Sequence, residues 1–320
     1  MAFEDALPSL CHRKSQIGIW YCHDHCCRKQ ETVITRPKPA SSFAGEAEME
    51  GNDNAEAPET IAADAGFPFA DRVQAIEIAD VLQWLRAGWQ DLRTAGWISP
   101  AYGSIFLFAG FALTKGLVLL EMPYLILPMI GGFLLIAPVL TLGLYRISKD
   151  IEEGRRPSFW AALTAFRANP YHILTAGLLL MLFIMIWARI NVILFALSFP
   201  YVSMSLDSLV SQLLTTQGFV FLGLATVVGF GFALLAFVTN VTALPMMLDS
   251  REDIFSAALV SAIAVFKNPR PMMVWAALIV FITGIGLVTA FLGLVITLPL
   301  IGHASWHAYR RLIRCDPAPE

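Results

Sequence analysis

The residues with the clearest chemical potential are two histidines near the C-terminal end. His303 and His307 are four positions apart, so on a helix they share one face, where two neutral imidazoles can bind a metal ion or the edge of a haem. Ala304, Ser305 and Trp306 lie between them, so the glutamate of a zinc-protease helix is missing. Two ligands are fewer than a zinc site uses. The pair therefore leaves two interpretations open: a metal- or haem-binding redox subunit that takes further ligands from elsewhere, or histidines hydrogen-bonded at a membrane surface.

A second group of metal-binding residue types lies near the N-terminus. Four of the five cysteines fall close together there, with three histidines among them. The spacing matches no closed zinc site, and two adjacent cysteines fit poorly around one tetrahedral ion. We therefore predict no resident cofactor and leave the role of the cluster open. Its members are Cys11, His12, Cys22, His23, His25, Cys26 and Cys27.

Four further residues are candidates for binding, and none is a candidate for catalysis. Arg189 lies inside an apolar run, where a charge is costly, so it would contact an anion or lipid headgroup, or pair structurally with a carbonyl group. Asn240 lies in another apolar run and could hydrogen-bond between helices. Asp249 and Arg251 belong to the motif LPMMLDSRED, which we expect at the cytoplasmic surface as a salt-bridged cap or as a docking site.

The composition excludes a soluble globular enzyme. Apolar residues make up 57% of the 320 residues and charged residues only 15%, whereas soluble domains average about 45–50% and 25%. The net charge of −3 gives no basic surface for nucleic acid. Phosphate-binding loops, HExxH helices and serine nucleophile elbows are missing from the sequence. The lipid bilayer is therefore the expected partner, and the oligomeric state is left open.

Long apolar runs predict an all-α fold, a polytopic membrane bundle of about six transmembrane helices. A helix of about 20 residues crosses the hydrocarbon core. The last apolar run has 30 uncharged residues, which is too long for one span, so we predict a helical hairpin there. Basic residues are frequent in 146–167 and 251–270 and absent from 200–218, so the positive-inside rule places both termini in the cytoplasm. The predicted spans are near 102–120, 124–145, 171–198, 219–246, 272–287 and 289–309.

An internal repeat organises these spans. Three times an amphipathic segment ends in a proline and is followed by a hydrophobic pair; the segments are Trp84–Pro100, Phe159–Pro170 and Phe255–Pro269. We expect each segment to lie in the membrane plane with its aromatic side chains in the headgroup region. The alternative is that the segments pack on one another beneath the bundle.

The chain divides into a polar extension, residues 1–70, and an integral membrane domain, residues 71–320. The extension is rich in Ala, Glu, Pro and Ser with few large apolar side chains, which predicts a disordered cytoplasmic segment. Met49 lies within it and is an alternative start of translation, in which case residues 1–48 would be missing from the mature protein.

Four motifs carry a resemblance to a known family: GFLLIAPVLTLGLYRIS, LPMMLDSRED, NPRPMMVWAAL and GLVITLPLIGHASWHAYRRL. Over about residues 84–312 the chain resembles a family of uncharacterised, mostly proteobacterial integral membrane proteins of unknown function. The family typically has Asp-Arg where this chain has Asp249-Ser250-Arg251. The resemblance implies the bacterial inner membrane and no known reaction.

These observations predict a non-enzymatic inner-membrane protein that handles a small molecule or lipid, as a permease or an accessory protein. The repeated helical pairs support this, because repeats that meet in the membrane commonly frame a substrate path. The alternatives are the redox subunit described above and a membrane scaffold that recruits partners through the N-terminal extension.

Overall fold

The structure is a computed structural model that describes residues 69–122, 126–199 and 211–314. The predictions for the polar extension, for translation from Met49 and for the N-terminal group of cysteines and histidines lie outside the described residues. So does most of the loop at 200–218.

The described chain is helical, as predicted from the apolar runs, and its one β-interaction is an isolated bridge between Val73 and Ile313. The elements are η1 (Ala70–Arg72), α1 (Ile78–Ala95), α2 (Ile98–Leu119), α3 (Ile126–Leu140), α4 (Leu142–Glu152), α5 (Phe159–Leu163), η3 (Ala165–Ala168), α6 (Pro170–Ser198), α8 (Thr216–Asn240), α9 (Ala243–Asp249), α10 (Ile254–Lys267), α11 (Pro269–Val288) and α12 (Leu294–Leu312).

Four helical stretches of the described chain are long and apolar enough to cross a membrane: α2, α6, the continuous stretch Thr216–Asp249 formed by α8 and α9, and α11. The fold is therefore a helical membrane bundle with four candidate spans. α3, with 15 residues, and α12, which is polar in its second half, do not meet these criteria. The count of six spans stays a prediction.

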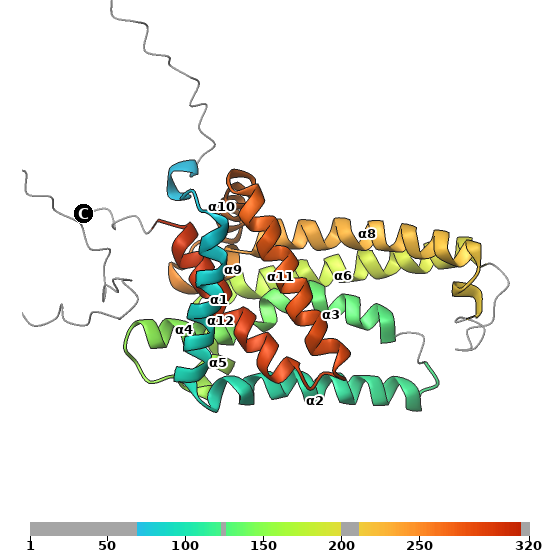
Figure 1. The fold of residues 1–320 in the computed structure, drawn as a ribbon, viewed down its shortest axis with the longest axis horizontal. Helices are drawn as coiled ribbons and strands as arrows, with labels where there is room; N and C mark the ends of the chain where they lie inside the picture. Colours follow the sequence, from blue (N-terminus) through green and yellow to red (C-terminus); the bar gives the residue numbers. More distant parts are fainter. Residues whose placement is uncertain (1–68, 123–125, 200–210, 315–320) are drawn as a thin grey trace, which may run out of the picture. The chain divides into compact units, whose positions relative to one another are not determined.

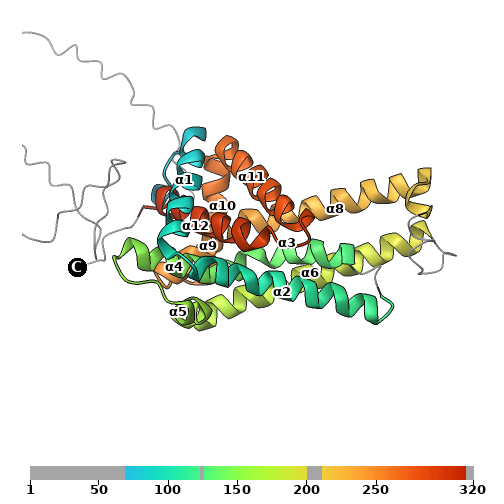
Figure 2. The same ribbon diagram turned by 60° about the horizontal axis from the view of Figure 1, so that its bottom comes forward.

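The long helices form two groups. In one, α3, α6 and α8 pack on one another around Leu180 and Ala236; in the other, α2 and α11 both pack against α12. Figure 1 shows α6 and α8 side by side, with α2 set apart from them. In Figure 2, where the bottom of the molecule is turned forward, α2 crosses α6 in projection. α2 and α3 follow each other in the chain, yet each packs mainly on helices of its own group.

The shorter helices gather around one end of these groups and form what we call the cap: α1, α4, α5, α9, α10 and the second half of α12. In Figure 1, α1 runs across the end of the long helices instead of along them. Close contact between α1 and α12 requires glycine at position 88, because a Cβ there would lie 2.7 Å from the backbone nitrogen of Ala304. Gly103 similarly lets α2 approach the backbone of Val295.

No two of the amphipathic segments pack extensively on each other in the described structure, because α1 packs mainly on α12 and α11. Trp84 of α1 is buried edge-on against Trp275 of α11, with ring centroids 5.6 Å apart. The placement of the segments in the headgroup region stays a prediction. Trp97 and Trp160 are 71% and 73% exposed, as expected for side chains in the headgroup region. One face of α1 thus belongs to the protein core, while the residues at its end are available to lipid.

The two ends of the described chain lie together at the cap. The backbone nitrogen of Gln74 donates to the carbonyl of Leu312 at 2.8 Å, and that of Arg314 donates to the carbonyl of Arg72 at 2.8 Å. Residues 72–74 and 312–314 therefore leave the bundle on the same side.

The order of elements alternates as the repeat predicts. An amphipathic element is followed three times by an apolar pair: α1 by α2 and α3, α5 with η3 by α6 and α8, and α10 by α11 and α12. The first two pairs then break near Thr141 and Thr242 and continue into α4 and α9, whereas α12 continues through Pro299. Whether these units are true repeats stays a prediction.

Candidate functional site

Arg189 is not part of a polar site in the described structure. It lies on an exposed face of α6, and no ion pair joins its guanidinium to another described residue. Nine residues, or about 14 Å of helix, separate it from Ser198 at the end of α6. A side chain in this position can extend along the helix toward the membrane surface.

The other three binding candidates do not form a common site. The Asn240 side chain donates to the carbonyl of Ala236 at 2.9 Å, so its contact lies within α8 and not between helices. Arg251 is exposed, with a φ of 54°, and turns the chain between α9 and α10. Asp249 alone enters a polar network.

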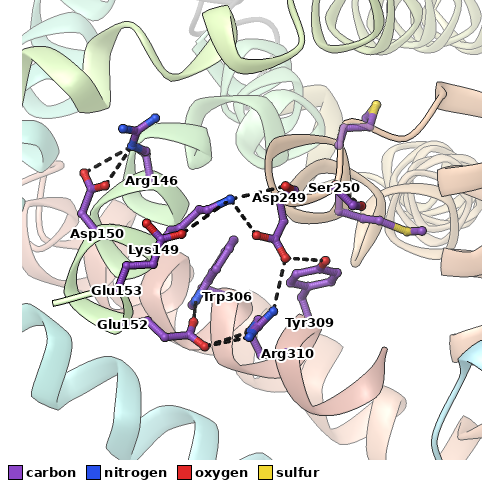
Figure 3. A network of polar contacts seen from close by, with 12 residues as sticks. Arg146, Lys149, Asp150, Glu152, Glu153, Asp249, Ser250, Trp306, Tyr309 and Arg310 are labelled. Carbon is purple, nitrogen blue, oxygen red and sulfur yellow. Dashed lines mark hydrogen bonds and ion pairs between the residues drawn. The ribbon is translucent and has the colours of Figure 1, made fainter. Parts of the chain in front are cut away.

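Asp249 forms ion pairs with basic side chains of two other helices at the cap (Figure 3). Its Oδ1 lies 2.7 Å from Nζ of Lys149 on α4, and its Oδ2 accepts from Nη1 of Arg310 at 3.2 Å. The hydroxyl of Tyr309 donates to the same Oδ2 at 3.0 Å. One carboxylate at the end of α9 therefore joins α4 to α12, through ion-pair partners that lie on other helices and not in its own motif. Whether this motif is a salt-bridged cap or a docking site stays a prediction.

Glu152 extends the network along α12. Its Oε1 lies 2.9 Å from Nη2 of Arg310, and its Oε2 accepts from the indole nitrogen of Trp306 at 2.8 Å. On the other side of α4, Asp150 pairs with Arg146 and Arg155. Glu152 and Asp150 are not among the candidates predicted from the sequence, although their place on a strongly amphipathic segment after an apolar run could have indicated them.

His303 is fully buried where three helices meet. Its Nε2 is 2.8 Å from the hydroxyl of Ser99 on α2, and its Nδ1 is 2.7 Å from the hydroxyl of Ser148 on α4. Burial is the largest influence and lowers the pKa of His303 to about 4. The ring is therefore neutral at pH 7, with one nitrogen donating to a serine and the other accepting.

The two histidines do not converge on a shared ligand position. His307 Nε2 lies 2.8 Å from Oδ2 of Asp91, so it ties α12 to α1, whereas His303 ties α12 to α2 and α4. Within residues 69–122, 126–199 and 211–314, no group of three or more His, Cys, Asp or Glu side chains could hold a metal ion. Both ring nitrogens of His303 are already hydrogen-bonded, so the described contacts give the redox hypothesis no additional ligand.

An apolar groove lies between α2 and α3, where the two helix groups meet. Its volume is about 220 Å³, and the tip of the α11–α12 hairpin forms part of its wall. The rings of Phe106 and Phe133, both in its lining, pack against each other at a tilt, with centroids 6.3 Å apart. Its lining residues are Phe106, Ala109, Gly110, Leu113, Thr114, Leu117, Ile126, Met129, Ile130, Phe133, Leu140, Leu287, Phe291 and Leu294.

The groove contains none of the residues singled out from the sequence. Its lining is apolar apart from the hydroxyl of Thr114, and no lining residue carries a charge. Ionisable residues stand out in an apolar run, whereas the ordinary apolar side chains that form this groove do not differ in type from those around them. The groove arises from tertiary structure, because the consecutive helices α2 and α3 pack on different partners.

The fold and these sites define the class: an integral membrane protein whose helices enclose an apolar groove, with a polar cap at one end. Residues 126–249, from the start of α3 to the end of α9, match the model of a family described as predicted integral membrane protein (DUF2189), whose function is unknown. This confirms the resemblance over that segment; outside it, the resemblance stays a prediction. Neither the curated proteins nor the solved structures include a match to this chain.

Proposed function

We propose that this chain is a multi-pass inner-membrane protein that handles a lipid within the bilayer, as a permease or an accessory protein and not as an enzyme. The apolar groove between α2 and α3 carries the proposal. A polar solute would lose its hydrogen bonds to water in this groove without finding charged partners, whereas a hydrocarbon chain loses nothing comparable.

The proposed topology places the cap and both ends of the described chain on the cytoplasmic side. The basic residues of segments 146–167 and 251–270 support it through the positive-inside rule. The pairing of residues 72–74 with 312–314 supports it too, because both ends then leave on one side.

We further propose that the α11–α12 hairpin enters the membrane from the cap and returns without reaching the far side. The ring of Phe291 at its tip packs against Gly110, nine residues before the end of α2 at Leu119, which is about 14 Å of helix. In Figure 1 the connection between α11 and α12 ends well short of the far end of α2. This proposal replaces the last two predicted spans by one re-entrant hairpin.

A cysteine at position 290, in this connection, is expected to be inaccessible from outside the cell. In a variant with the five native cysteines changed to serine, Ala290→Cys should react with a membrane-impermeant maleimide at least about tenfold more slowly than Leu120→Cys, because a thiol among apolar groups stays un-ionised. Leu120 is 70% exposed at the far end of α2 and serves as the matched control. Equal labelling of the two cysteines from outside would show that the hairpin crosses the membrane.

The proposed function is tested by lipid retention. The full chain would be reconstituted in nanodiscs of phosphatidylethanolamine and phosphatidylglycerol, extracted into detergent that strips surface lipid, and analysed by native mass spectrometry. We expect one lipid to remain bound per chain. Protein that emerges entirely free of lipid, or that retains a polar solute in its place, would contradict the proposal.

A further inference from the structure

The dimensions of the groove match one leaflet of a bilayer. Along α2 its lining runs from Phe106 to Leu117, eleven residues or about 16 Å of helix. The hydrocarbon core of a bilayer is about 30 Å thick, so the acyl chains of one leaflet occupy about 15 Å. Phe106 lies eight residues inside α2, which begins at the cap at Ile98. The groove therefore occupies the half of the membrane farther from the cap.

The end of the groove nearer the cap is closed. Leu140 lies there, and the hydroxyl of Tyr102 donates to its carbonyl at 2.9 Å, which joins α2 to α3 beneath the groove. Leu287, Phe291 and Leu294 of the hairpin cover the side. An occupant cannot extend from here toward the cap without displacing buried side chains.

The far end is lined by α2 and α3 alone. Leu117 and Ile126 lie there, close to the connection between the two helices, and the hairpin stops before it reaches them. Leu113 and Met129 are 47% and 37% exposed, so lipid has access to the middle of the groove from the side. An occupant therefore enters from the surrounding lipid and points its free end toward the cap.

From this geometry we infer that the groove binds a single acyl chain of a phospholipid in the leaflet farther from the cap. The terminal methyl group lies at the closed end beside Phe106 and Leu140, and the ester end lies near Leu117 and Ile126. The inference rests on the proposed function and refines it: it names the part of the lipid that is recognised, its direction and the residue that limits its length.

Filling the groove tests the location of the chain. Ala109→Trp places an indole among the lining residues, and Ala112→Trp places the same group on the lipid-facing side of the same helix, outside the groove. The probe is phosphatidylethanolamine with a diazirine near the end of one acyl chain. In the wild-type protein, cross-links should concentrate on peptides that contain Phe133 or Phe291. We expect Ala109→Trp to reduce them roughly tenfold and Ala112→Trp to leave them unchanged.

Opening the closed end tests the direction of the chain. Phe106→Ala removes a ring from the closed end, so the retained lipid should shift toward acyl chains about two carbons longer. Phe108→Ala, at an exposed position of the same helix outside the groove, should leave the chain length unchanged. These variants change different parts of the groove, so a folding defect in Ala109→Trp, detected by its unfolding temperature, would not prevent the test.

The outcomes separate this inference from the proposed function. Equal lipid retention by the wild type, Ala109→Trp and Ala112→Trp, with cross-links spread over all lipid-facing helices, would overturn the groove assignment and leave lipid handling intact. Retention of an isoprenoid in place of an acyl lipid would likewise overturn it. Loss of all lipid from the wild-type protein would overturn both.

Discussion

Acidification from pH 7 to pH 4 is expected to lower the free energy of unfolding by about 3 kcal/mol through His303 alone. The ordinary pKa of this side chain is 6.5, and burial lowers it to about 4 in the folded protein. Between these values the unfolded chain binds a proton that the folded chain does not, so stability falls as the pH falls. The contribution is fully present above pH 6.5 and is lost progressively down to about pH 4.

The measurement is the unfolding of the detergent-solubilised protein as a function of pH, for the wild type and for His303→Gln. A glutamine can bond to Ser99 or Ser148 but does not titrate, so the variant should be less stable at pH 7 and lose less stability on acidification. Parallel pH profiles for the wild type and His303→Gln would show that other groups cause the acid sensitivity.

Replacing Asp249 by alanine is expected to lower the free energy of unfolding by about 2–3 kcal/mol. The substitution removes this carboxylate from Lys149, from the hydroxyl of Tyr309 and from Arg310, which still pairs with Glu152. The network is only partly buried, with 17% of the Asp249 side chain exposed, so water offsets part of the loss and the effect stays below that of a fully buried pair.

Arg251→Ala is the nearby control for this prediction. Arg251 is exposed, two residues from Asp249 and outside the network in Figure 3, so its replacement should change stability by less than about 0.5 kcal/mol. Combining Asp249→Ala with Lys149→Ala should show a coupling of about 1–2 kcal/mol in a double-mutant cycle. Additive effects of the two substitutions would mean that the ion pair at the cap contributes little.

The histidine pair shows why residue spacing alone did not identify the contacts. Four-residue spacing correctly implies that His303 and His307 share a side of α12, but each ring bonds to a different helix. The partners Ser99, Ser148 and Asp91 lie more than 150 residues away along the chain. Local periodicity contains no information about which distant helix will supply a hydrogen bond.

Arg189 shows that an unusual residue type alone does not identify a binding site either. Its charge within an apolar run made it the leading binding candidate, because an ionisable group in the membrane is costly. The structure places it on an exposed face of α6, away from the groove. The position of a residue along a helix can be predicted from the sequence, whereas the face that becomes exposed depends on which helices pack beside it.

The sequence by itself determined the all-helical membrane class and the amphipathic elements before the apolar pairs, because composition and local periodicity encode them. Only the tertiary structure decided that α2 and α3 separate into different groups, that the α11–α12 hairpin ends beside Gly110, and that a groove lies between them. The physical reason is that apolar helices in a membrane are alike in hydrophobicity. Their partners are selected by close packing, as at Gly88 and Gly103, which depends on the shapes of surfaces far apart in the chain.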